Sequence, residues 1–429
     1  MGTTSATTAV AGEGQPSTAR PAGLGVLIAD KFEPAGVEAI EALGCSVGLN
    51  ANLTPAALPA AVAAQNPEIL IVRSTVVGEA VFEATGKLSL VIRAGAGYDN
   101  IDVAAASDRG VFVANCPGKN SIAVAELVWA LILSCDRRLP DQTADLRAGT
   151  WNKKEYAKAA GLYGRTLGIV GLGGIGREVA ERGKAFGMKV AVWSRSLTEK
   201  VADNLGVAYC GNLINLAKLS DVISVNVAGT EETRGLIGEK FCAALKPGAY
   251  VINTSRGSVV DAKALTRAIR EKGIRAGLDV YADEPGGRTG KFTDRIVHEP
   301  GVYGTHHVGA STDQAQQAVA AEVVRIIASY LGRGEVPHCV NRAASTSANS
   351  LLTVRHLNQP GVLAHVFYTL GQARINVEEM ENIIYDGAKA ACARIQLDEP
   401  PGDDHLNAIR ANESVLSVTV TSITPRASE

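Results

Sequence analysis

The sequence lacks the features that would place a protein in a membrane or against a charged polymer. No uninterrupted apolar run approaches the ~18 residues that indicate a transmembrane helix. Acidic and basic residues nearly balance, 44 against 42, and leave a net charge of −2. This balance gives no electrostatic reason to expect nucleic acid or a membrane surface as a partner.

Cysteine is also scarce and irregularly placed. Seven cysteines are scattered along 429 residues without a C-x-x-C pair, so we expect reduced thiols in a cytoplasmic protein, with neither disulfides nor a metal site. Residues 1–22 are rich in Ser, Thr, Ala and Gly and lack apolar periodicity, which predicts a disordered tail. A Ser-rich organelle-targeting segment is the alternative. A signal peptide is not expected, because the apolar stretch that it needs is missing.

Strand and helix patterns alternate from Gly25 onward and then begin a second alternation at Thr166. Short β-branched runs separated by helix-period segments indicate parallel strands with crossover helices. We therefore predict two Rossmann-like, doubly wound parallel-sheet domains. The first is a substrate-binding lobe over 23–118, completed by 308–335, and the second is a dinucleotide-binding domain over 119–307. A long helix over 120–138, capped by Asn120, opens the second domain.

The pattern changes after a predicted linker over 336–348. Residues 349–429 alternate as strand–helix–strand–strand–helix–strand, which predicts a separate ferredoxin-like α+β domain. The complete expectation is thus an α/β protein with two Rossmann-like lobes and a small C-terminal α+β domain.

A glycine-rich turn opens the second alternation. Gly171, Gly173 and Gly176 in LGIVGLGGIG directly follow a predicted strand and begin a helix. This context favours a dinucleotide site, since the glycines let a pyrophosphate approach the backbone at the helix N-terminus. At the end of the next strand no acid is present, and Ser194-Arg195-Ser196 could bind a 2′-phosphate. This modestly favours NADP over NAD; the alternative is an exposed arginine with NAD held elsewhere.

Three further motifs carry residues suited to keto-acid chemistry: VINTSRGSVVD, GLDVYADEP and THHVGAST. Together with the glycine-rich turn they resemble the D-isomer-specific 2-hydroxyacid dehydrogenases, and most of all the 3-phosphoglycerate dehydrogenase branch with a C-terminal ACT domain. The resemblance covers residues from about 23 to 423. It implies that Arg256 binds the substrate carboxylate and that His307 is the acid/base. It also implies that Glu284 raises the pKa of His307 and orients its ring.

The adjacent His306 stands where the family pattern has proline. In an extended segment successive side chains point opposite ways, so we expect only His307 to face the cleft and His306 to be a packing or surface residue. The stretch between Glu284 and His307 is also longer than in the family, with GGRTG (286–290) as the predicted insertion.

The resemblance also implies further ligand-binding positions. The expected cofactor-binding residues are Gly171, Gly173, Gly174, Ile175, Gly176, Ser194, Arg195, Ser196, Val227, Ala228, Thr254, Ser255 and Asp279. The expected substrate-binding residues are Arg73, Ser74, the backbone of Gly95, Ala96 and Gly97, Asn120, and Lys153 offered by a partner subunit. Arg73 suits a second anionic group such as a phosphate. Arg73 paired with an acid and Lys153 merely solvated are the alternatives.

In the C-terminal domain, His356, Asn358 and Asn376 match residues that bind serine in feedback-inhibited members, at a domain–domain interface where one amino acid bridges two copies. A domain that only holds subunits of a homodimer or homotetramer together is the alternative. The expected activity is interconversion of 3-phosphoglycerate and 3-phosphohydroxypyruvate in L-serine biosynthesis. An NADPH-dependent hydroxypyruvate or glyoxylate reductase is the nearest rival, and a non-catalytic dinucleotide-sensing scaffold is a remote one.

Overall fold

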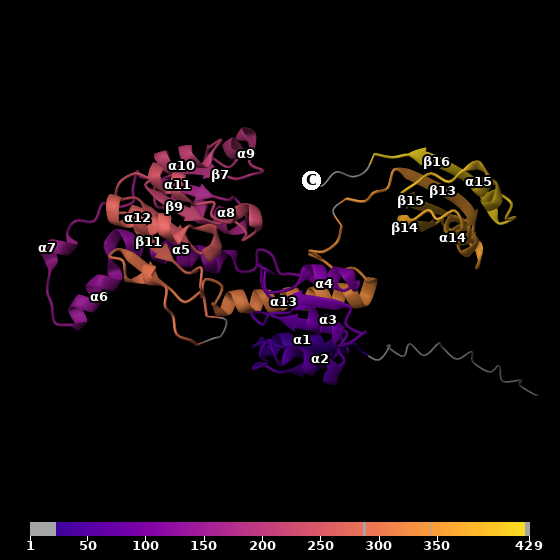
Figure 1. Cartoon of the computed structure of the whole chain (residues 1–429), viewed down its shortest axis with the longest axis horizontal. Helices are drawn as coiled ribbons and strands as arrows, with labels where there is room; N and C mark the ends of the chain where they lie inside the picture. The colour runs from indigo at the N-terminus through magenta and orange to yellow at the C-terminus, as the bar shows by residue number, and fades with distance from the viewer. Residues whose placement is uncertain (1–22, 286–288, 344, 425–429) are drawn as a thin grey trace, which may run out of the picture. The chain divides into compact units, whose positions relative to one another are not determined.

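A computed structural model describes residues 23–285, 289–343 and 345–424. The predicted tail over 1–22 and residues 286–288 of the predicted insertion lie outside these ranges. The chain forms two compact units that divide between Asn341 and Arg342. Figure 1 labels their helices and strands.

The first sheet of the larger unit has five parallel strands in the order β2-β1-β3-β4-β5. Their bounds are β1 (Gly25–Ile28), β2 (Ser46–Leu49), β3 (Ile69–Val72), β4 (Leu90–Arg93) and β5 (Phe112–Ala114). Apolar residues alternate between its two faces, so both faces are buried. Leu27 and Leu70 contribute to one core, and Ile28 and Ile71 to the other.

Helices cover both faces of this sheet (Figure 1). One core takes residues from α2 (Leu58–Gln65), α3 (Glu79–Glu83) and α4 (Val103–Asp108); the other takes residues from α1 (Pro34–Ala42) and α13 (Asp313–Arg333). The late helix α13 therefore returns to pack on the first sheet. It begins at a Thr312 cap and ends at Gly334, whose φ is 71°, as expected for a left-handed terminating residue.

The second sheet has seven parallel strands in the order β12-β11-β10-β9-β6-β7-β8. Its strands are β6 (Thr166–Val170), β7 (Lys189–Trp193), β8 (Ala208–Tyr209), β9 (Val222–Val225), β10 (Tyr250–Asn253), β11 (Arg275–Leu278) and β12 (Val302–Gly304). After β6 the chain moves to β7 on one side and later to β9 on the other. The carboxyl ends of β6 and β9 thus flank a topological switch point, where doubly wound sheets bind ligands.

The second sheet is covered by α5 (Ser121–Arg137), α8 (Gly174–Ala185) and α9 (Glu199–Asn204) on one face, and by α10 (Leu213–Leu219), α11 (Glu239–Ala244) and α12 (Ala262–Lys272) on the other. Single turns occur at η1 (Glu231–Thr233), η2 (Gly257–Val259) and η3 (Arg295–His298). Two exposed helices, α6 (Leu139–Arg147) and α7 (Lys153–Tyr156), follow α5 and bury none of their residues.

The smaller unit is an antiparallel four-stranded sheet in the order β14-β15-β13-β16. Its elements are β13 (Ser350–Leu357), α14 (Val362–Gln372), β14 (Val377–Ile384), β15 (Ala390–Leu397), α15 (Asp403–Arg410) and β16 (Val415–Ser422). Both helices bury apolar residues against the sheet, among them Val366, Leu370 and Ile409. The predicted fold class, two Rossmann-like lobes with a ferredoxin-like domain, is confirmed.

Several local expectations differ from the structure. The patterns missed β2, β8, β12, α6 and α7, which are short or exposed. The helix expected after β11 is absent; between β11 and β12 the described residues form only η3. Part of the predicted linker belongs to the first sheet, since Val340 donates to Val113 O and Asn115 donates to His338 O. The edge strand β5 has backbone groups that need partners, and this segment supplies them.

Among the described residues, no helix has both the length and the apolar character needed to cross a membrane.

Candidate active site

The glycine-rich turn lies at the switch point of the second sheet. A Cβ on Gly171 (φ 91°) would lie 2.6 Å from Asn226 O, and one on Gly176 would overlap Gly171 O. A Cβ on Gly173 would instead enter open space, with nothing within 4 Å. Gly173 is also the N-cap of α8, without a side-chain cap. The turn is thus closed toward the protein and open toward a ligand, which fits a dinucleotide phosphate at a helix N-terminus.

Other expected cofactor residues surround this turn. Val227 lies against Gly171, 2.8 Å from the Cβ position, and Ile175 packs on the neighbouring core. Ser194 follows β7 and is half-buried, whereas Arg195 and Ser196 are exposed. Ala228 is exposed, and its carbonyl accepts from Thr233 Oγ1 at 2.6 Å.

Asn253, three residues before Arg256, organises the turn after β10. Asn253 Oδ1 accepts from Ser255 N at 3.1 Å and Ser255 Oγ at 2.7 Å, and Asn253 Nδ2 donates to Arg256 O at 2.9 Å. Thr254 and Ser255 are buried. The Ser255 hydroxyl is therefore used inside the turn, which holds Arg256 at the carboxyl edge of the sheet.

The histidine–glutamate pair is formed as expected from the resemblance. His307 Nδ1 and Glu284 Oε2 are 2.6 Å apart, and Glu284 Oε1 accepts from Tyr281 N at 2.9 Å. Burial raises the pKa of Glu284, but the bonds from His307 and Tyr281 outweigh it and lower that pKa overall. The carboxylate therefore stays ionised and binds Nδ1, which leaves Nε2 of His307 for a substrate.

The extended conformation expected for the segment that carries His306 and His307 is contradicted. Strand β12 ends at Gly304, and His307 has φ 52°, so the pair is not in extended conformation. A left-handed turn, rather than strand alternation, directs His307 to Glu284. His306 is exposed.

The buried Asp279 explains the left-handed turn at His307. It is 1% exposed, and its carboxylate accepts from Thr305 Oγ1, Val308 N and Gly309 N at 2.6–2.9 Å. Its carbonyl also accepts from His307 N at 2.8 Å. All of these bonds are internal, so Asp279 holds the histidine loop, and its contact with the cofactor stays a prediction.

The loop after β4 brings the first lobe to Arg256. A Cβ on Gly95 would overlap the guanidinium of Arg93, and one on Gly97 would overlap Nη2 of Arg256. Asp99, from the same loop, pairs with Arg256: Nη2 is 2.8 Å from Oδ1. The Gly95 amide donates to Arg93 O at 2.8 Å within the tight turn, and its contact with a substrate stays a prediction.

Arg73 and Ser74 follow β3 and are fixed through their backbone. Asp30 Oδ2, at the end of β1, accepts from the amides of Arg73, Ser74 and Thr75 at 2.7–3.1 Å. The Arg73 guanidinium donates to Gln316 Oε1 at 2.9 Å. Among the described residues, neither Arg73 nor Arg93 has a carboxylate within ion-pair distance.

Arg93 is electrostatically unusual. Its Nε is buried without a hydrogen-bond partner among the described residues. Burial and, after it, the charge of Arg256 lower its pKa to about 10, while Asp99 acts in the opposite direction. Three guanidiniums therefore lie in one neighbourhood with few carboxylates, which favours an anionic ligand.

Two predicted substrate residues are less defined. Asn120 is the N-cap position of α5 but makes no side-chain cap bond, so the predicted capping role is wrong; its Oδ1 is buried without a partner in the described chain. Lys153 lies exposed in α7. The contribution of Lys153 to a partner subunit's site stays a prediction.

The three predicted effector residues are not brought together within one copy. Asn358 follows β13 and donates to Ala388 O, whereas Asn376 precedes β14 at the opposite end of β15, where it bonds Asp398. The length of β15 separates these ends by about 23 Å. His356 is 2% exposed, and its Nδ1 lies 2.7 Å from Leu357 O. The ring is therefore buried within one copy, and its effector contact stays a prediction.

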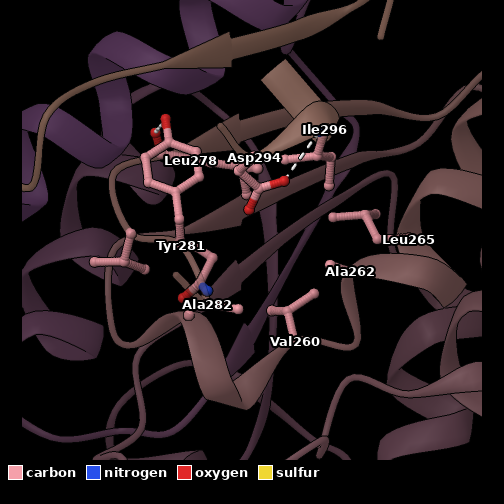
Figure 2. Close-up of a pocket in the computed structure, with 11 residues that line it drawn as sticks. Val260, Ala262, Leu265, Leu278, Tyr281, Ala282, Asp294 and Ile296 are labelled. Atoms are coloured by element: carbon pink, nitrogen blue, oxygen red, sulfur yellow. Dashed lines mark hydrogen bonds between the residues drawn. The ribbon is translucent and has the colours of Figure 1, made fainter. Parts of the chain in front are cut away.

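A small cavity of about 20 Å³ lies behind the loop that carries Glu284. Figure 2 shows its lining by Val260 and Leu265 on one side and by Tyr281 and Ala282 on the other. Asp294 also lines it and accepts from Ile296 N at 3.1 Å. It holds one water at most and is therefore not the substrate site.

Four residues that organise the site were missed by the sequence analysis: Asp30, Arg93, Asp99 and Asn253. Three of them share a signal, because Arg93 and Asn253 end a buried strand and Asp30 comes two residues after one. Polar residues at the carboxyl ends of parallel strands mark ligand sites in this fold class.

Comparison with known proteins is consistent with this geometry. The family described as "D-isomer specific 2-hydroxyacid dehydrogenase, NAD binding domain" matches residues 129–309. A D-3-phosphoglycerate dehydrogenase of Methanocaldococcus jannaschii is 38% identical over 313 residues, which cover 72% of this chain and 58% of that protein. A glyoxylate reductase of Thermococcus litoralis is 38% identical over 280 residues, 63% of this chain and 82% of that protein. The chain belongs to the D-isomer specific 2-hydroxyacid dehydrogenase family.

A solved family structure extends the comparison to the ligand. It is an NADPH-dependent glyoxylate/hydroxypyruvate reductase from Sinorhizobium meliloti, in complex with NADP and malonate. Its TM-score is 0.64 at 29% identity, and the match covers 74% of this chain and 96% of that one. As a member of the family, the chain binds a nicotinamide dinucleotide, and the open face of Gly173 fits that ligand.

Proposed function

We propose that this protein is an NAD(P)-dependent dehydrogenase that interconverts 3-phosphoglycerate and 3-phosphohydroxypyruvate, the reaction that opens L-serine biosynthesis. The observation that carries the substrate class is the pair Arg73 and Arg93, two guanidiniums without a carboxylate partner in the described chain. A plain 2-keto acid offers one carboxylate, which Arg256 can bind. A phosphate gives the other two arginines a ligand.

The dinucleotide supplies or accepts the hydride. In the direction of reduction, His307 holds a proton on Nε2 and donates it to the substrate carbonyl oxygen; in oxidation the same nitrogen takes the hydroxyl proton. Glu284 fixes the orientation of the ring through Nδ1, which lies 2.6 Å from Glu284 Oε2. Arg256 binds the carboxylate and polarises the neighbouring carbonyl.

Steady-state kinetics with a panel of substrates tests this proposal. Wild-type protein is assayed with 3-phosphohydroxypyruvate, hydroxypyruvate and glyoxylate against both reduced dinucleotides. We expect the highest kcat/KM for the phosphorylated substrate, and we expect Arg93→Gln and Arg73→Gln to lower it by roughly 10-fold or more each. Both variants should leave glyoxylate reduction within a few-fold.

The rival is a glyoxylate or hydroxypyruvate reductase, as in the Thermococcus litoralis relative. A wild-type preference for glyoxylate, with no loss in either arginine variant, would establish the rival instead. Absence of turnover with every 2-keto acid would favour the dinucleotide-sensing scaffold.

The acid/base role is tested by a matched pair of neighbours. His307→Ala should lower kcat by roughly 10²–10⁴-fold, because a positioned acid/base is lost, whereas His306→Ala should stay within a few-fold. Equal losses in the two variants contradict the assignment.

The finer cofactor preference is also proposed. We infer that NADP(H) is accepted at least as well as NAD(H), because the loop after β7 offers Ser194, Arg195 and Ser196 and no carboxylate. The exposed Arg195 lies near Glu232, whose pKa it helps to lower. We also propose that the protein is a homo-oligomer, in which Lys153 of one copy reaches the site of another copy. We propose a cytoplasmic location, where the seven free cysteines would remain reduced.

Regulation by L-serine at a junction between two copies, as the resemblance implies, is also proposed. Because Asn358 and Asn376 lie at opposite ends of the sheet, a serine site needs Asn358 from one copy and Asn376 from another. Isothermal calorimetry with L-serine tests this. We expect binding that Asn358→Ala abolishes while basal activity is kept; no binding up to millimolar serine leaves assembly as the domain's role.

A further inference from the structure

The ion pair between Asp99 and Arg256 connects the two lobes of the larger unit at the site. Asp99 comes from the loop after β4 of the first sheet, and Arg256 from the turn after β10 of the second. Arg256 Nε lies 3.1 Å from Asp99 Oδ2, and Nη2 lies 2.8 Å from Oδ1. One edge of the guanidinium is therefore held side-on by a carboxylate.

We propose that Asp99 is the positioning residue that turns the Nη1–Nη2 edge of Arg256 toward the substrate carboxylate. This inference rests on the proposed function, because it takes Arg256 as the residue that binds that carboxylate.

The hydrogen-bond inventory of Arg256 supports this orientation. A guanidinium has five N–H donors. Asp99 takes the Nε donor and one of the Nη2 donors, and Ser255 O takes one Nη1 donor at 2.7 Å. One donor remains on Nη1 and one on Nη2. Two donors on adjacent nitrogens are the set that binds a carboxylate bidentately.

Two neighbouring glycines lie against the Arg256 side chain and restrict its other orientations. The guanidinium lies over Gly97, where any Cβ would overlap Nη2, and a Cβ on Gly229 would lie 2.6 Å from Arg256 Cγ. The long side chain is thus enclosed along its stem and at its head. Without Asp99, nothing described in the chain would hold the Nε edge, and the head could rotate about its last torsions.

Asp99 also acts through its negative charge. Arg93, Arg73 and Arg256 repel one another, and Asp99 opposes this effect on Arg93. Burial raises the pKa of Asp99, but the Arg256 hydrogen bonds and charge outweigh it, so that pKa is lowered. Asp99 is consequently ionised throughout the neutral range.

A purely structural role predicts something different. The Asp99 side chain is 58% exposed, and exposed ion pairs contribute little to stability. Replacing Asp99 should therefore leave the melting temperature nearly unchanged while catalysis falls. This separation of effects distinguishes positioning from folding.

The test combines kinetics with a double-mutant cycle on the full chain. We expect Asp99→Ala and Asp99→Asn to raise KM for the preferred 2-keto acid by about 10–100-fold, with a smaller loss in kcat, since misplacement of about 1 Å can cost about 100-fold. The dinucleotide Kd should stay within twofold, and Asp99→Glu should recover part of the loss. Glu231→Gln is the matched control, because it breaks an exposed pair with Arg234 elsewhere.

Asp99→Ala is then introduced into Arg256→Ala. Because Asp99 acts through Arg256, the second change should alter kcat/KM less than twofold in that background. An unchanged KM in the single variants, or an equal loss in both backgrounds, overturns the proposal. Wild type that turns over no 2-keto acid refutes the proposed function instead, so the two failures are distinguishable.

Discussion

The two glycine-rich loops of the larger unit use the same amino acid for opposite purposes. In the turn after β6, Gly171 and Gly176 bring backbone segments together, and Gly173 leaves its outer side open. In the loop after β4, Gly95 and Gly97 are covered by the guanidiniums of Arg93 and Arg256. The turn after β6 thus leaves space for a ligand, whereas the loop after β4 leaves space for the guanidiniums of Arg93 and Arg256.

This difference follows from the charges that each loop handles. A dinucleotide pyrophosphate can be met by backbone amides and a helix N-terminus without any side chain. A small 2-keto acid needs directional, charged donors, and these must come from arginines that lie flat against the backbone. A Cβ at Gly97 therefore displaces the Arg256 guanidinium, whereas a Cβ at Gly173 only enters the space left for the cofactor.

The largest expected effect follows from filling the second loop. In Gly97→Ala the new methyl group overlaps Arg256 Nη2, so we expect kcat/KM to fall by roughly 10²–10³-fold. The dinucleotide Kd, measured by fluorescence titration, should change less than twofold. Gly86→Ala is the control, because its Cβ meets nothing within 4 Å. Similar activity in both variants would remove the contrast between the loops.

Filling the first loop should have the converse result. In Gly173→Ala the methyl group enters the space left for the pyrophosphate, so the dinucleotide Kd should rise by about 10-fold, that is ~1.4 kcal/mol. Near saturating cofactor, KM for the keto acid should hold within twofold. A variant that binds dinucleotide as tightly as wild type would show that the ligand does not approach Gly173.

One added charge in the loop after β7 should change the cofactor preference. Ser194→Asp should shift preference toward NAD(H) by about 10-fold, because the new carboxylate repels the 2′-phosphate. The measurement is the ratio of kcat/KM for the two reduced dinucleotides. Should wild type already prefer NADH by more than about 10-fold (~1.4 kcal/mol), the proposed NADP preference is wrong.

The smallest expected effect concerns the segment between β5 and α5, which contains Lys119 and lies between the two loops in the sequence. A Cβ on Gly174 would lie 2.5 Å from Ser121 Oγ, so the cofactor turn packs on residues next to Lys119. Lys119 pairs at 3.1 Å with the buried Glu322, which also contacts His338. Hydrogen bonds from Arg325 and Lys119 lower the pKa of Glu322 to about 2. Glu322→Gln should therefore lower the free energy of unfolding at pH 7 by roughly 2 kcal/mol, with little change in KM.

The pH dependence gives this prediction its sign. A carboxylate with a lowered pKa contributes fully above about pH 4.5, its ordinary value, and loses that contribution as pH falls toward about 2. The difference between wild type and Glu322→Gln, measured by denaturant unfolding, should thus shrink from pH 5 to pH 2. A difference that stays constant or grows on acidification contradicts the assigned charge state.

Much of the fold was predictable from patterns that are local. Buried parallel strands such as ILIV over 69–72 are apolar on both faces, and this distinguishes them without tertiary information. The elements that were missed have no such pattern: β8 is two exposed residues, and α6 buries none of its side chains. Elements that bury little surface leave little trace in hydrophobic periodicity.

The sequence by itself located the glycine-rich turn, and through the resemblance of their motifs to the family it predicted Arg256, Glu284 and His307 as site residues. Only the tertiary structure decided how these residues are held. His307 is turned by a left-handed backbone that the buried Asp279 fixes, and Arg256 is oriented by Asp99, which lies 157 residues away in the chain. Such contacts depend on the carboxyl ends of two separate sheets meeting at one site. No local pattern encodes them, because a long-range hydrogen bond leaves no periodicity in either segment that forms it.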